Sequence, residues 1–170
     1  MADPRIPLHP NTYVLEALSI LKPVTLPAKI KQARQAILNV RYCLIRYKFI
    51  ARAFAVGNAL VEAGMEPALL RDAVATMMAE STGSKLAKGY NKIGTPDETI
   101  DYGPYQINAI HGNDPAAVST YSGGAVAAVK LMIAYKARGK HPLDPWVAFR
   151  SGQYKYWLGV ADEAIAWMEL

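Results

Sequence analysis

Residues 67–83 read PALLRDAVATMMAESTG, and this stretch predicts a helix with one buried face. Pro67 suits the first turn of a helix, and Gly83 suits the left-handed residue that ends one. Between them, apolar side chains recur three and four positions apart, which places them on one arc of the helix. They are Leu69, Leu70, Ala73, Val74, Met77 and Met78. We therefore expect a helix from about residue 68 to residue 80 that packs against the rest of the fold.

Glu80 lies on the same arc, because it follows Ala73 by seven positions and Met77 by three. An ionised carboxylate is costly to bury, so this side chain is expected to be paired, neutralised or functional. In an apolar pocket a glutamic acid can keep its proton near neutral pH and donate it to a leaving-group oxygen. Cleavage of a glycosidic bond requires such a donor. The alternative is a glutamate at the end of a helix whose carboxylate reaches solvent.

The length and composition predict one compact domain. The chain has 170 residues, of which 52% are hydrophobic and 19% charged, a balance typical of a globular protein. Residues 1–27 hold five of the eleven prolines, so we interpret them as an N-terminal arm with at most a short helix around residues 13–21. Residues 28–170 are expected to form the domain. Residues 1–10 lack a charged-then-apolar pattern, so no secretory signal is expected.

A long helix is predicted from about residue 28 to residue 62, and basic residues form a stripe along it. Arg34, Arg41, Lys48 and Arg52 share one narrow face, and apolar side chains cover most of the remainder, which predicts a mostly buried helix. The stripe is interpreted as its solvated face. The net charge is +5, and residues 28–52 contain seven basic residues and no acidic one, so a membrane or nucleic-acid surface is the open alternative. Arg46, Lys48 and Arg52 interrupt the most apolar stretch, so no transmembrane span is expected.

After the Glu80 helix the pattern changes to loops and short strands. Glycine and proline are spread through residues 83–107, which predicts one or two hairpins. Helices are expected again after Asp114-Pro115, over residues 124–137, after Asp144-Pro145-Trp146, and over residues 154–168. Tyr121 and Tyr135 fall on helical patterns and are expected in the core. The fold class is therefore mostly α, with a small β or loop insertion between the Glu80 helix and the later helices.

Several common sites have no support in the sequence. The phosphate-loop, dinucleotide-binding and zinc-protease motifs are missing, and the three histidines are scattered singly. Cys43 is the single cysteine, which excludes an intramolecular disulfide framework. We expect no metal and no cofactor.

Three segments resemble the lysozyme-like lytic transglycosylase (SLT-type) family. They are residues 78–83 (MAESTG), 101–108 (DYGPYQIN) and 146–152 (WVAFRSG), and the resemblance covers about residues 69–160. It implies a lysozyme-like α+β catalytic domain in which Glu80 is the general acid and base and Ser81 helps to orient the Glu80 carboxyl group or a substrate group. It further implies that Gln106 and Asn108 line the cleft, that Tyr105 lies under the sugar, and that Tyr102 belongs to an Asp-Tyr-Gly variant of the motif.

The third segment departs from the family pattern. Phe149 stands where the family usually has tyrosine, and Arg150 where it has asparagine. Tyr154 or Tyr156 is the candidate to replace the missing hydroxyl. The resemblance implies a single acid assisted by the N-acetyl group of the substrate, with a 1,6-anhydro product. Paired-carboxylate glycosidases use a second acid, for which Asp97, Glu98 and Asp101 are the candidates.

The function expected from the resemblance is cleavage of peptidoglycan by a phage enzyme during entry or lysis. The predicted target is the β-1,4 bond between N-acetylmuramic acid and N-acetylglucosamine. The enzyme would reside in the virion or the host cytoplasm and act in the host periplasm, with other virion proteins as partners and without nucleic acid. In size and layout the chain is also similar to the lytic proteins of enveloped double-stranded RNA phages (cystoviruses), which implies an endopeptidase acting on stem-peptide cross-links. A non-catalytic basic helical protein that binds membrane or nucleic acid is the third hypothesis.

Overall fold

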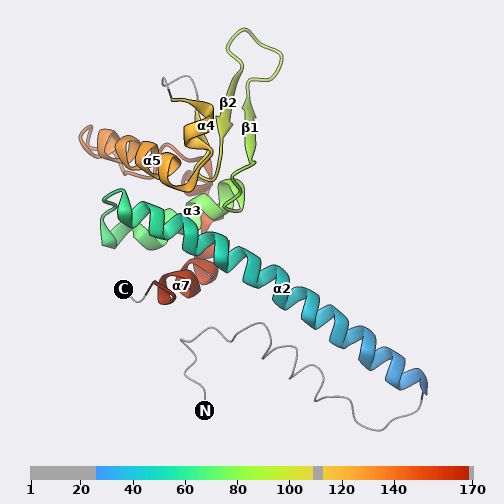
Figure 1. Cartoon of the computed structure of the whole chain (residues 1–170). Coiled ribbons are helices and arrows are strands. Elements are labelled where there is room, and N and C mark those ends of the chain that lie inside the picture. The colour runs from blue at the N-terminus through green and yellow to red at the C-terminus, as the bar shows by residue number, and fades with distance from the viewer. Residues whose placement is uncertain (1–25, 109–112, 169–170) are drawn as a thin grey trace.

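The computed structural model describes residues 26–108 and 113–168. These residues are mostly helical with one small sheet, so the predicted mostly α fold class is confirmed at this level (Figure 1). The arm over residues 1–27 and the short helix predicted near residues 13–21 lie outside the described residues, except that the first long helix already begins at Leu26. The helices are α2 (Leu26–Glu62), α3 (Pro67–Ser81), α4 (Pro115–Val118), α5 (Tyr121–Lys136), α6 (Val147–Arg150), the 3-10 helix η2 (Gln153–Trp157) and α7 (Leu158–Ala166). The strands are β1 (Lys88–Asn91), β2 (Thr99–Tyr102) and β3 (Ile107–Asn108).

Helix α3 is the centre of the fold. It packs against α2, α6, η2 and α7, and α5 also packs on α2 (Figure 1). Most of its residues are buried, including Thr76, whose hydroxyl donates to the carbonyl of Asp72 at 2.6 Å. The apolar arc predicted from the sequence is buried except for Leu69, which is half-buried. Because α3 is enclosed, the side chains of its last turn are positioned by surrounding elements.

The end of α3 differs in detail from the prediction. The first left-handed residue is Thr82 (φ 53°), whose N–H donates to the carbonyl of Met78 at 2.8 Å, and Gly83 (φ 64°) follows it. A β-branched residue in this region is strained. Position 83 also favours glycine, because a Cβ there would lie 3.0 Å from both the Arg52 Cβ and the Met78 sulfur.

The predicted insertion is a three-stranded antiparallel sheet with the order β1-β2-β3. Asp101 on β2 is opposite Gly89 on β1 and Asn108 on β3. In Figure 1 the β1–β2 hairpin projects away from the helices. The sheet therefore brings polar residues from three separate strands side by side.

The later helices begin and end differently from the prediction. Helix α5 begins at Tyr121, because the Thr120 hydroxyl accepts the Gly123 N–H at 3.0 Å. Helix α6 begins only at Val147, since the Asp144 carboxylate accepts the His141 N–H instead of capping a helix. The helix expected over residues 154–168 is divided into η2 and α7. Both α6 and η2 are short, and the left-handed Gly152 (φ 77°) separates them.

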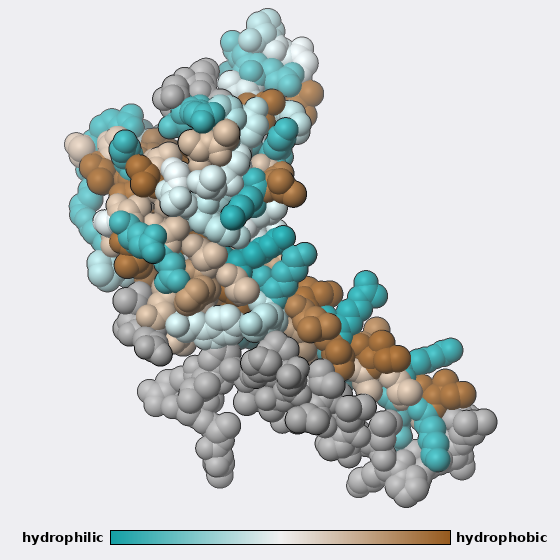
Figure 2. All heavy atoms as spheres, viewed as in Figure 1, coloured by the Kyte–Doolittle hydropathy of each residue, from teal (hydrophilic) through white to brown (hydrophobic). Residues whose placement is uncertain are grey.

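The prediction that the first long helix is mostly buried is wrong for its first half. Residues of α2 enter the core only from Ile50 onward, where Ala53, Val56 and Leu60 are buried. The physical reason is length: 37 residues at 1.5 Å each make a helix of about 55 Å, whereas α3 has 15 residues and α7 has nine. The first half of α2 projects from the body in Figures 1 and 2. Cys43 lies on this half and is partly exposed.

Candidate active site

Glu80 lies in the last turn of α3 and is half-buried. Its Oε1 accepts the N–H of Ala148 at 2.6 Å. Ala148 belongs to the first turn of α6, where backbone N–H groups have no acceptor within the helix. No other hydrogen bond reaches the Glu80 carboxyl group from residues 26–108 and 113–168. One oxygen is thus fixed, and Glu80 is one of the residues that line a cleft.

This cleft has a volume of about 530 Å³ and is open to solvent. Its lining comes from the sheet, from the end of α5 and from the segment that leads into α6. Its lining residues are Glu80, Asn91, Asp101, Gln106, Asn108, Leu131, Tyr135, Arg138, Pro145, Trp146 and Val147. Three of the predicted site residues, Glu80, Gln106 and Asn108, are therefore brought together.

The wall beneath the sheet is held by two buried aromatic residues. The Trp146 Nε1–H donates to the carbonyl of Tyr105 at 2.7 Å, and the Tyr105 hydroxyl donates to the carbonyl of Val56 at 3.1 Å. Tyr105 is completely buried, and burial raises its pKa well above the ordinary value. Its predicted position under a sugar ring does not fit this burial. The side chain instead ties the cleft wall to α2.

A carboxylate and three amides, those of Asn91, Gln106 and Asn108, form the sheet side of the cleft. Asp101 accepts hydrogen bonds from the Asn91 amide at 2.8 Å and from the Asn108 amide at 2.7 Å. Of the three candidates for a second acid, Asp101 lines the cleft. Asp97 forms an ion pair with Lys92 at the hairpin tip.

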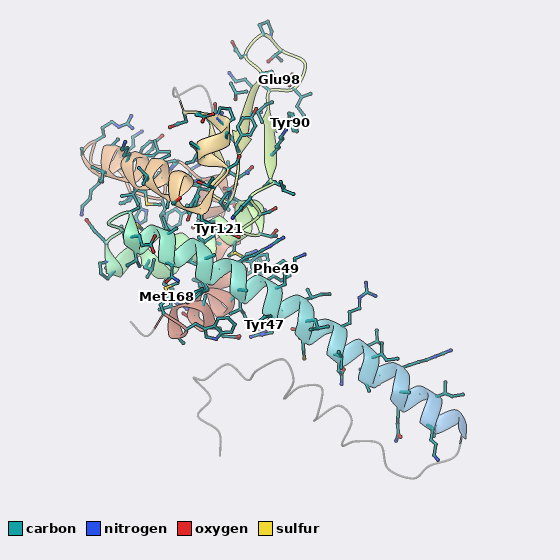
Figure 3. All side chains as sticks on the ribbon, viewed as in Figure 1. Tyr47, Phe49, Tyr90, Glu98, Tyr121 and Met168 are labelled. Atoms are coloured by element: carbon teal, nitrogen blue, oxygen red, sulfur yellow. The ribbon has the colours of Figure 1, made fainter. Side chains whose placement is uncertain are left out.

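Glu98 also lies near this tip, where it accepts the N–H of Gly94 at 2.9 Å (Figure 3). Asp97 and Glu98 are therefore outside the cleft, and Asp101 is the carboxylate that shares it with Glu80.

Gln106 has a left-handed backbone (φ 48°), which is uncommon for a residue other than glycine. Its amide donates to the carbonyl of Gly103 at 2.8 Å, and its oxygen lies so close to Gly89 that a Cβ there would be 2.6 Å away. The side chain is thus held between Gly103 and Gly89, where it lines the cleft.

Ser81 does not reach the cleft. Its hydroxyl is buried 2.6 Å from the carbonyl oxygen of Pro104 and accepts the N–H of Gly83 at 3.1 Å. The predicted role of orienting the Glu80 carboxyl group is not supported by a contact between them. Ser81 instead joins the end of α3 to the segment before β3.

The remaining predicted aromatic residues lie away from the cleft. Phe149 is between the rings of His141 (4.4 Å) and Tyr154 (5.0 Å), and Tyr156 is 89% exposed on η2. Tyr102 packs against the core with Lys88 over its ring. Neither Tyr154 nor Tyr156 places a hydroxyl among the residues that line the cleft.

Arg150 is turned away as well, because its guanidinium donates to the carbonyls of Asp144 and Pro145. Neither Tyr154 nor Tyr156 therefore replaces the hydroxyl that is missing at Phe149.

The sequence prediction missed Tyr135 and Arg138. Both line the cleft, and the Arg138 guanidinium lies 4.4 Å from the centre of the Tyr135 ring, with the Lys140 ammonium at 5.7 Å. Tyr135 was expected in the core but is half-buried. An aromatic and an arginine three positions apart at the end of a helix is the signal that could have indicated them.

The three sequence segments that carry the family resemblance meet at the cleft. Ser81 joins the first to the second at Pro104, Trp146 joins the third to the second at Tyr105, and Ala148 joins the third to the first at Glu80. Within the part of the chain that the structure describes, no group of three or more His, Cys, Asp or Glu side chains is arranged to hold a metal ion. None of the protein-family models, curated proteins or solved structures compared with this chain matches it.

Proposed function

We propose that this protein is a lysozyme-like enzyme that cleaves the β-1,4 glycosidic bond of peptidoglycan in the bacterial periplasm, with Glu80 as its general acid and base. The observation that carries the proposal is the position of Glu80. It lines a cleft of about 530 Å³, and one of its carboxyl oxygens is fixed by the Ala148 amide. A proton donor must be held at a fixed place relative to the bond that breaks.

The proposed reaction uses one carboxyl group twice. Glu80 donates its proton to the glycosidic oxygen as the bond from that oxygen to C1 of the muramyl sugar breaks. The N-acetyl group of the substrate stabilises the positive charge at C1. The resulting Glu80 carboxylate then accepts the proton of the C6 hydroxyl as that oxygen bonds to C1, which gives a 1,6-anhydro end and restores the acid.

Asp101 is proposed to position the cleft amides rather than to act as a second acid. Both of its oxygens already accept hydrogen bonds, one from Asn91 and one from Asn108. Amide side chains offer donors and acceptors that match sugar hydroxyls and N-acetyl groups. At the other wall, the aromatic face of Tyr135 suits a sugar ring, and the guanidinium of Arg138 suits an anionic substituent on that ring.

The decisive variant is Glu80→Gln. Glutamine retains an oxygen that can accept the Ala148 N–H, so we expect a loss of stability no larger than about 1 kcal/mol, or roughly 2–4 °C in Tm. General acid catalysis contributes about 10²- to 10⁴-fold, so cleavage of purified sacculi should fall by at least about 100-fold. Glu98→Gln is the matched control at the hairpin tip and should retain full activity.

Two readouts separate the alternatives. Turbidity of outer-membrane-permeabilised Gram-negative cells measures lysis, and mass spectrometry of the digested sacculi identifies the broken bond. Anhydromuramyl ends are expected. Freed amino groups of diaminopimelate would instead assign the protein as an endopeptidase, and full activity of Glu80→Gln would remove Glu80 from the mechanism.

A further inference from the structure

The projecting half of α2 carries aliphatic side chains that no element of the described structure covers. Ile30, Ile37, Leu38, Leu44 and Ile45 are 45–66% exposed. The contacts of α2 with α7 begin at Arg46, which forms an ion pair with Glu163, and at Tyr47, whose ring lies 5.5 Å from that of Trp167. The aliphatic side chains before Arg46 therefore contribute nothing to the core described above.

Basic residues lie between these aliphatic residues on the same side of the helix. At about 100° per residue, Arg34, Arg41 and Lys48 form a central row within an arc of about 120°. Ile30, Ile37 and Leu44 border this row on one side, and Leu38 and Ile45 border it on the other. We call this arc the outward face of α2. Figure 2 shows hydrophobic and hydrophilic groups next to one another along the projecting half of α2.

The charge on this face is of one sign. Residues 28–52 contain seven basic residues and no acidic one, so the face would attract an anionic surface. A guanidinium binds a phosphate through paired N–H groups. Nucleic acid would neutralise the basic row through its phosphates but would leave the aliphatic rows in water, so those side chains would contribute no hydrophobic free energy to binding.

A bilayer surface accepts both kinds of side chain at once. Helices of this type lie in the plane of the interface, where aliphatic side chains enter the acyl boundary and basic side chains extend to the phosphates. A second copy of the helix would bring two basic rows together, which is repulsive. No helix among the described residues is long and apolar enough to span a bilayer, so the contact would be with the surface.

We propose that the outward face of α2 binds the surface of an anionic lipid bilayer. The binding combines attraction of the basic row to lipid phosphates with partial burial of the aliphatic rows. It goes beyond the proposed enzymatic function and does not depend on it, since no residue of the face lines the Glu80 cleft.

The test is co-sedimentation of the full chain with vesicles of phosphatidylcholine alone and of phosphatidylcholine mixed with phosphatidylglycerol. Binding is expected for the mixed vesicles only. Each basic residue near an anionic surface contributes about fivefold, so the triple variant R34Q/R41Q/K48Q should lower the partition coefficient about 100-fold. A control triple, K85Q/K130Q/K155Q, removes the same charge from other exposed sites and should bind like the wild type.

The aliphatic rows are tested separately. I37S/L44S keeps every charge and should lower binding to the mixed vesicles by at least about 10-fold, whereas I93S/I133S, at two exposed sites elsewhere, should not. Thermal unfolding checks that all variants fold. Equal loss in both charge triples, or unchanged binding of I37S/L44S, would overturn the proposal. So would a wild type that binds a DNA duplex or forms a dimer but does not sediment with the mixed vesicles.

Discussion

Gly124→Ala is expected to destabilise the protein, although alanine is the better helix former. Gly124 lies in α5, where a Cβ would be 2.5 Å from the Tyr105 ring and 2.7 Å from the carbonyl oxygen of Val118. Carbon atoms in contact are normally about 3.5–4.0 Å apart, so the ring or the backbone must move by about 1 Å. Tyr105 has little freedom to move, because it is buried and its hydroxyl is bonded to Val56.

The magnitude follows from two opposing contributions. Overpacking of this kind costs about 1–3 kcal/mol, and here both obstacles are rigid, so we take the upper value. Replacing glycine by alanine inside a helix contributes about 1 kcal/mol in the other direction. The net loss is about 2 kcal/mol, which corresponds to a Tm lower by roughly 4–8 °C in a chain of this size.

Gly159→Ala is the matched control. Gly159 lies in α7, and a Cβ there meets no atom within 4 Å, so only the gain of about 1 kcal/mol remains. Urea and thermal unfolding followed by circular dichroism measure both variants. A Gly124→Ala protein as stable as the wild type would refute the close packing of Tyr105 against α5, and so would equal effects of the two substitutions.

Three further predictions concern strain, pH and substrate charge. Thr82→Gly should raise Tm by about 2 °C, because relief of about 1–2 kcal/mol of left-handed strain exceeds the entropic cost of glycine. The hydrogen bond from Arg71 lowers the pKa of Asp162, so this ion pair stabilises the fold above the ordinary carboxyl pKa and ceases to do so as the pH falls through the lowered pKa. Asp162→Asn should therefore lower the free energy of unfolding by less than about 1 kcal/mol at neutral pH, and the difference from the wild type should vanish in acid. Arg138→Gln should raise KM about 10-fold for peptide-bearing peptidoglycan and leave KM unchanged for peptide-free glycan strands, since a stem-peptide carboxylate would pair with the guanidinium.

The elements near the site could be predicted because their signals are local. The apolar arc of residues 67–83 and the glycines of residues 83–107 indicate α3 and the sheet without reference to any partner. The spacing of Glu80 on that arc indicated that it turns inward, and it is indeed half-buried beside the cleft.

Other features depend on tertiary contacts and could not be predicted. Periodicity shows which side of α2 is apolar, but not whether another element covers it, so the exposure of Ile37 and Leu44 was missed. For the same reason, Tyr105 was expected in the cleft and Tyr135 in the core, but the structure has them the other way round. Tyr105 is buried between Val56 of α2 and Gly124 of α5, whereas Tyr135, in the last turn of α5, borders the cleft.

The contacts around Tyr105 connect the stability of the fold to the position of Glu80. The Tyr105 carbonyl accepts the Trp146 Nε1–H, and Trp146 lies two residues before Ala148, whose N–H holds the Glu80 carboxyl group. A shift of Tyr105 of about 1 Å, forced by Gly124→Ala, would therefore move the start of α6 and with it the donor that fixes the acid. Because a 1 Å misplacement can cost about 100-fold in rate, Gly124→Ala should reduce sacculus cleavage well below the fraction that remains folded at the assay temperature. Cleavage that declines only in proportion to unfolding would mean that the wall formed by Tyr105 and Trp146 does not position Glu80.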